Sequence, residues 1–142
     1  MLLVLLLLSS LSAVGAFNET LFRGMLINHY NYLRSLHDAP SLGVDNSLDI
    51  AATAWARNLA FYPNPTCLYH SRHGGENIYM RYDTHQLSEE TLARSAAKAF
   101  YEEFSYYDYA HPGLVNRAAH FTNIVWNDVR YLGIGLVHRM FS

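Results

Sequence analysis

The chain has 142 residues, and its 10 basic and 12 acidic side chains give a formal net charge of −2. A balance so close to neutral provides no broad cationic field, so binding to nucleic acid or to an anionic membrane surface is not expected. The single cysteine, Cys67, excludes an intrachain disulfide, and we expect its thiol either to be buried or to form an intermolecular bond.

Residues 1–16 have the features of a secretory signal peptide. An entirely apolar run, residues 2–8, is followed by the small residues of 14–16, which a signal peptidase can recognise. The run is too short to cross a bilayer, which needs about 20 residues, and we expect no transmembrane segment. We therefore predict an extracellular, secreted protein that is cleaved after Ala16, with residues 17–142 as one domain. The alternative is an uncleaved N-terminal anchor.

The apolar periodicity predicts three helices. The first spans residues 18–37, with Asn18 as N-cap and Pro40 just beyond its end. The second is the alanine-rich segment 48–60, which two prolines follow. The third begins at Ser88, has acidic residues in its first turn, and runs to about residue 104.

Two short segments are predicted strands: residues 76–80, after a glycine pair, and residues 132–138. The loop 105–119 is rich in Tyr, Gly and Pro and is long enough to line a site. Periodicity alone leaves residues 120–125 open between helix and strand. The order helix, helix, strand, helix, strand predicts an α+β fold or a sheet sandwiched by helices.

Three blocks of the sequence then point to one family. They are residues 33–60 (LRSLHDAPSLGVDNSLDIAATAWARNLA), 74–79 (GGENIY) and 120–135 (HFTNIVWNDVRYLGIG). In this order and spacing they resemble the CAP superfamily, which includes cysteine-rich secretory proteins, insect venom allergens and plant pathogenesis-related proteins. The resemblance implies a three-layer α-β-α sandwich, secretion, and a short helix at 120–125.

The resemblance also has departures. Family members usually continue past the L-G-x-G motif through another strand, whereas this chain ends at Ser142. We therefore expect a C-terminally truncated CAP domain that lacks its last strand. The disulfides common in the family are absent as well.

The resemblance implies a cleft with two histidines and two glutamates. The residues at the matching positions are His70, Glu76, Glu103 and His120. His73 competes with His70 for the first position, because the segment before Glu76 is short. Glu103 is selected by a match in which Phe100 replaces a tryptophan.

Neutral imidazoles are good Zn²⁺ ligands, and nearby carboxylates can orient them, so His70 and His120 are candidate ligands of a weakly bound zinc ion. The sequence has no H-E-x-x-H helix to fix such a site. The alternative for His120 is a buried histidine that the backbone satisfies. Glu76 and His120 could also act as base and acid in a hydrolase. Ser71 beside His70 lacks a visible oxyanion hole, so no catalytic residue is assigned.

The first functional hypothesis is a secreted, non-enzymatic binding protein. The resemblance adds sterol or another lipid as ligand, and an extracellular protein as a further partner. The second hypothesis is a metal-dependent hydrolase. The third is a truncated isoform without independent activity, whose incomplete sheet a partner strand could fill.

Several other residues are expected to have structural roles. Asn77 is expected to fix the turn after Glu76. Three large aromatic residues are expected in the core: Trp55, Phe100 and Trp126. Histidines without a motif are expected at the surface or in packing: His29, His37, His85, His111 and His138.

Overall fold

The computed structural model describes residues 1–9, 16–62, 68–72 and 74–140, which contain both helices and strands. The elements in chain order are β1 (Leu2–Ser9), α1 (Glu19–Ser35), β2 (Gly43–Val44), α2 (Asn46–Ala60), β3 (Glu76–Asp83), α3 (Glu89–Tyr101), the 3₁₀ helices η1 (Glu102–Tyr106) and η2 (Asn116–Ala118), α4 (Ala119–Val125) and β4 (Tyr131–Met140). This mixture of helix and strand confirms the predicted α+β class.

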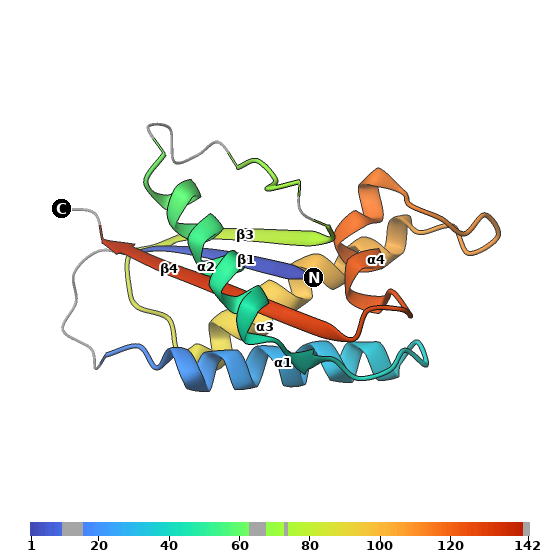
Figure 1. The fold of residues 1–142 in the computed structure, drawn as a ribbon, viewed down its shortest axis with the longest axis horizontal. Coiled ribbons are helices and arrows are strands. Elements are labelled where there is room, and N and C mark those ends of the chain that lie inside the picture. Colours follow the sequence, from blue (N-terminus) through green and yellow to red (C-terminus); the bar gives the residue numbers. More distant parts are fainter. Residues whose placement is uncertain (10–15, 63–67, 73, 141–142) are drawn as a thin grey trace.

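The sheet has the strand order β2-β4-β1-β3, and every neighbouring pair is parallel. Strand β1 lies between β3 and β4 (Figure 1), with Leu2 opposite both Glu76 and Gly133. Strand β2 pairs only with the start of β4. The apolar run at residues 2–8, which is predicted to belong to a signal peptide, is therefore part of a central strand in the full chain.

Strand β4 presents alternate residues to the two faces of the sheet. Leu132, Ile134 and Leu136 belong to the main core together with residues of α1 and α3. Gly133 and Gly135 lie against α2 instead. A Cβ atom at Gly133 would be 2.3 Å from Cβ of Leu48, and one at Gly135 would be 2.2 Å from the carbonyl of Ala52. The two glycines thus let α2 approach the sheet closely.

Helix α1 buries one face against the core and contains a buried arginine. Asn18 caps the helix by accepting a hydrogen bond from the Leu21 backbone N–H at 3.0 Å. The buried residues recur every four positions, as expected for a helix with one apolar stripe, and they are Phe22, Leu26, Tyr30 and Arg34.

The guanidinium of Arg34 is fully buried and donates to four backbone carbonyls. The acceptors are those of Pro40 at 2.6 Å, Ile124 at 2.7 Å, Val129 at 2.9 Å and Trp126 at 3.1 Å. Three of these carbonyls belong to the end of α4 and the turn into β4. Arg34 therefore fixes the segment that connects α4 to the sheet.

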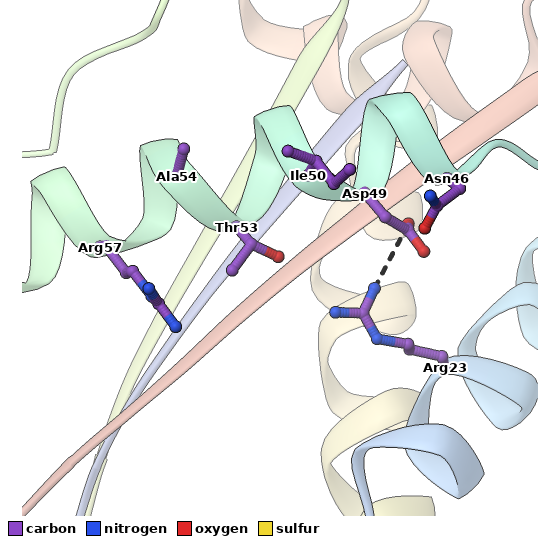
Figure 2. A pocket seen from close by; sticks show the side chains of 7 residues that line it. All are labelled: Arg23, Asn46, Asp49, Ile50, Thr53, Ala54 and Arg57. Atoms are coloured by element: carbon purple, nitrogen blue, oxygen red, sulfur yellow. Dashed lines mark ion pairs between the residues drawn. The ribbon is translucent and has the colours of Figure 1, made fainter.

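The edge of β4 next to β2 is closed by two side chains. The backbone N–H of Ile134 donates to Oδ1 of Asp49 at 2.6 Å, and the guanidinium of Arg23 donates to the carbonyl of Ile134. Arg23 of α1 and Asp49 of α2 form an ion pair (Figure 2). Their nitrogen and oxygen atoms are 3.3 Å apart, and both residues line a cavity of about 500 Å³. A carboxylate and a guanidinium thus satisfy the edge groups that a strand would otherwise pair.

The predicted elements are largely confirmed, with shifted ends. The three helices are present, and the third continues as η1 through Glu103. Residues 120–125 are helical in α4. Strand β3 extends to Asp83, three residues beyond its prediction, and β4 covers the predicted 132–138. The predicted lack of a last strand stays a prediction, and Cys67 and His73 lie outside the described residues.

Core placement is confirmed for Phe100 and wrong for Trp126. Phe100 is 3% exposed, whereas Trp126 is 43% exposed. Trp126 is the residue just after α4, and it lines two cavities instead of packing in the core. Trp55 is partly buried and packs against the cluster beneath α2. Within the described ranges, no helix is long and apolar enough to span a membrane.

Candidate functional site

His70 and Glu76 form the first polar pair of the site. Nδ1 of His70 lies 2.7 Å from Oε1 of Glu76, and the same oxygen accepts the backbone N–H of Ser71 at 3.1 Å. The Glu76 carboxylate is almost completely buried, whereas the His70 side chain is 57% exposed. An ionised carboxylate only accepts hydrogen bonds, so this contact favours the tautomer with the proton on Nδ1, and in the neutral form of that tautomer Nε2 is an acceptor. His70 can therefore accept a hydrogen bond from a ligand.

Glu103 and His120 form the second pair, which joins η1 to α4. Oε1 of Glu103 lies 2.7 Å from Nδ1 of His120, and Oε2 accepts the backbone N–H of His120 at 2.9 Å. The ring of His120 also packs against Phe100, with centroids 5.0 Å apart. The carboxylate therefore holds both the backbone and the ring of the histidine, and it fixes the same tautomer as in the first pair.

Two asparagines connect the pairs. The Asn77 amide donates to the carbonyl of His120 at 3.1 Å. The Asn123 amide donates to Oδ1 of Asn77 at 2.9 Å and to the carbonyl of Glu76 at 3.3 Å. Asn77 is fully buried, but it does not fix a turn after Glu76 as predicted, because Glu76–Asp83 is one continuous strand; its amide contacts α4 instead. These bonds place the start of β3 against α4, which brings all four predicted residues to one region of the fold.

A cavity of about 520 Å³ lies beside the first pair. Its polar side includes His70, Glu76 and Asn123. Its apolar wall is formed by Met1, Leu114, Ala119, Trp126 and Val129. Leu114 is 74% exposed, so a large apolar side chain is presented to solvent near a buried carboxylate. A cavity of this size, apolar with a few convergent polar groups, is typical of a small-molecule site.

A smaller aromatic cavity of about 290 Å³ shares Trp126 with the first one. His37, Tyr107, Tyr109 and Phe121 are among its lining residues. Nε2 of His37 lies 2.9 Å from the hydroxyl of Tyr101, and burial raises the pKa of that tyrosine. The Tyr-rich loop that was predicted to line a site therefore contributes to a cavity.

The fit of a metal ion is incomplete. In both pairs Nδ1 is bound to a carboxylate, which is the arrangement that orients zinc-ligating histidines. Within residues 1–9, 16–62, 68–72 and 74–140, however, no group of three or more His, Cys, Asp or Glu side chains could hold a metal ion. Zinc sites in proteins normally use at least three protein ligands. A site on His70 and His120 alone would fall short of that number.

Two residues of the site carried no signal in the sequence, and for a third the only signal was the length and composition of its loop. Asn123 follows Thr122 in the family-like block but has no titratable group that would single it out. Leu114 lies in the long loop, and Met1 lies at the far end of the chain from the blocks that carry the resemblance. Only the tertiary fold brings these three residues to the same cavity.

Comparison with known proteins gives a consistent result. The family model of the cysteine-rich secretory protein family (CAP) matches residues 27–139. Protein PRY2 of Saccharomyces cerevisiae is 32% identical over 117 residues, which cover 81% of this chain and 32% of the yeast protein. The human Golgi-associated plant pathogenesis-related protein 1 is 26% identical over 120 residues, which cover 80% of this chain and 71% of the human protein. The chain thus spans about a third of the yeast relative.

Proposed function

Because this chain belongs to the cysteine-rich secretory protein (CAP) family, we propose that it is a non-enzymatic binding protein. Its ligand occupies the cavity bordered by His70, Glu76 and Trp126. The ligand is an apolar molecule with one hydrogen-bonding end, of the sterol or lipid class.

The observation that supports this proposal is the combination of exposed apolar residues and polar residues that line the cavity. Trp126 and Leu114 are 43% and 74% exposed, although both are large and apolar. Covering such side chains with an apolar ligand is favourable by about 25 cal/mol for each Å² removed from water. The wall thus favours a ligand with a substantial apolar body.

The polar residues of the lining favour a hydrogen-bond donor on the ligand. Nε2 of the neutral His70 ring can accept one hydrogen bond, and Oε2 of Glu76 is buried with no hydrogen-bond partner among the described residues. A buried carboxylate oxygen without a partner is unfavourable by about 1–3 kcal/mol or more. A ligand hydroxyl directed at this pair would therefore add orientation to the binding that the apolar wall provides.

A binding titration with a fluorescent sterol tests the proposal. We expect saturable binding to the full chain and a loss of at least about tenfold in affinity for Leu114→Asp, because the substitution places a charge on the apolar wall. Ile50→Asp is the matched control, since Ile50 is 64% exposed but lines the separate cavity near Arg23. Absence of saturable binding to the parent, or equal affinity of the parent and Leu114→Asp, contradicts the proposal.

We further propose that the protein is secreted after removal of residues 1–16, that its layers form the α-β-α sandwich of the family, and that it has an extracellular protein partner. The apolar run followed by small residues supports the first statement. Helices on both faces of the sheet support the second (Figure 1). N-terminal sequencing of protein collected from the medium tests cleavage, and Phe17 is the expected first residue.

The hydrolase hypothesis stays a prediction without added support. Ser71 contributes its backbone N–H to Glu76, and His70 is held by the same carboxylate. These hydrogen bonds are equally compatible with a purely structural role for the three residues. Turnover of ester and peptide substrates in the presence of Zn²⁺ by the parent, Glu76→Gln and His120→Ala tests this hypothesis, and Ser71→Ala tests a role for the serine. We expect no difference among the four proteins.

A further inference from the structure

Strand β1 occupies a position that holds the sheet together. Its eight residues are in parallel register with residues 76–83 on one side and 133–140 on the other. At its start, the carbonyl of Met1 accepts the N–H of Gly133 at 2.9 Å. In the described part of the chain β1 is the only strand neighbour of β3. Strand β3 is therefore joined to β4 through β1 alone.

The same residues form the apolar run of the proposed leader. Cleavage after Ala16 removes all of β1, so one molecule cannot both lose its leader and keep this sheet. We propose that the N-terminal segment has two mutually exclusive fates: it is the central strand of the chain that keeps it, and its removal opens a strand position between β3 and β4.

The open position is not easily closed. Neighbouring strands lie about 4.8 Å apart, so β3 and β4 would be separated by about twice that distance. Helix α2 packs on the sheet through Gly133 and Gly135, where added Cβ atoms would clash, which fixes β4 beneath it. Ile78 of β3 packs in the cluster beneath α2 together with Val137 of β4. Backbone groups facing an empty position between buried strands would lack partners, which is strongly unfavourable.

Removal of the segment would also change the cavity beside His70 and Glu76. Glu76 is the first residue of β3 and pairs with Leu2, so the position of its carboxylate depends on β1. Met1 lines the same cavity as His70, and its amino group donates to the carbonyl of Tyr131 at 3.2 Å. Burial lowers the pKa of this amino group. The retained segment thus supports the carboxylate and forms part of the cavity wall.

The first experiment uses intact chain made in a bacterial cytosol, with its N-terminus verified by mass. Leu5 is opposite Tyr79 and Leu136, and Leu5→Pro removes a ladder donor from the middle of the strand. Leu5→Val is the matched control because valine favours strands. We expect β3 amides of Leu5→Pro to exchange on the order of tenfold faster or more than in the parent, with Leu5→Val unchanged. A parent-like melt and parent-like exchange in Leu5→Pro overturn the proposal.

The second experiment compares the intact chain with chain that begins at Phe17, collected from secreting cells. We expect the processed chain to melt at a lower temperature than the intact chain and its β3 amides to exchange faster. A processed chain with the same melting midpoint and β3 protection as the intact chain overturns the proposal. Failure of sterol binding by the intact chain changes neither readout, so the two proposals fail separately.

Discussion

Glu103 holds His120 at two points, with Oε1 2.7 Å from the ring Nδ1 and Oε2 accepting the backbone N–H at 2.9 Å. One carboxylate thereby links the last turn after α3 to the start of α4. The orientation of the imidazole depends on a residue 17 positions earlier in the chain.

Glu103→Ala is expected to release the ring of His120. Without the carboxylate, the proton on Nδ1 is no longer favoured over Nε2, since the tautomer follows the hydrogen bond of the other nitrogen. Long-range ¹H–¹⁵N correlation spectra should show an Nδ1–H ring in the parent and a mixed ring in the variant. Glu102→Ala is the control, because this neighbour is exposed and pairs with the exposed Lys98 at 3.5 Å. An unchanged His120 tautomer in Glu103→Ala would contradict the expectation.

Arg34→Met is expected to destabilise the fold by about 3 kcal/mol or more, because several buried carbonyls lose their donor at once. Arg34→Lys should recover little of the lost stability, since an ammonium group cannot reproduce the planar set of donors of the guanidinium. Denaturant unfolding measures both variants. Arg94→Met on α3 is the control, since Arg94 is exposed. If Arg34→Met and Arg94→Met have similar free energies of unfolding, the four carbonyl contacts do not stabilise the protein.

Gly135→Ala should destabilise the protein because its Cβ would lie 2.2 Å from the backbone of Ala52. Overpacking of this kind is unfavourable by about 1–3 kcal/mol or more. Gly24→Ala is the control with the opposite expected sign. A Cβ at Gly24 meets nothing within 4 Å, and alanine in a helix interior is about 0.5–1 kcal/mol more favourable than glycine. Thermal melts of the two variants should move in opposite directions, and a parent-like Gly135→Ala melt would show that α2 can shift.

Glu89 gives a pH dependence of stability with a defined sign. The Asn18 backbone N–H, 2.7 Å away, lowers the pKa of Glu89. The ionised form is thus favoured in the folded state, and its contribution is present above the unfolded pKa of about 4.3 and lost as the pH falls through the folded value. Glu89→Gln should lower the melting midpoint at pH 7, with the difference from the parent shrinking toward pH 3. A difference that is constant over this range excludes the effect.

Zinc binding by His70 and His120 stays a prediction, and a weak effect is expected because two histidines are fewer than the usual ligand set. Millimolar Zn²⁺ should raise the melting midpoint of the parent by about 1–3 °C relative to chelator, since a ligand of the folded state stabilises it. His120→Ala should show no shift. His111→Ala is the control, because His111 is exposed and paired with Asp108. Equal shifts in the parent and in His120→Ala would place the metal elsewhere.

The helices and most strands could be predicted because they follow from local periodicity and caps, as Asn18 and Ser88 illustrate. The burial of Arg34 could not, because its acceptors at Ile124, Trp126 and Val129 lie 90–95 residues away. The strand at residues 2–9 could not be predicted for another reason. A short apolar run has the same composition in a signal peptide and in a strand buried on both faces.

The candidate site shows a similar division. The resemblance to known proteins selected both His/Glu pairs, and the structure forms hydrogen bonds within each. The cavity beside them depends on Leu114 and Trp126, whose exposure is set by a loop and a helix end that have no periodicity. Trp126 was assigned to the core because aromatic residues in apolar segments usually pack there.

At Ile134, the carboxylate of Asp49 accepts from the backbone N–H and the guanidinium of Arg23 donates to the backbone carbonyl. In a wider sheet, the carbonyl and amide groups of a further strand would make these two hydrogen bonds. Asp49 and Arg23 therefore end the sheet on this side, because they occupy the backbone groups that a further strand would need. Replacing both with small apolar residues would leave a donor and an acceptor exposed in line with β4. That edge could then pair with an extended segment of another chain, so these two side chains protect the sheet from edge-to-edge association.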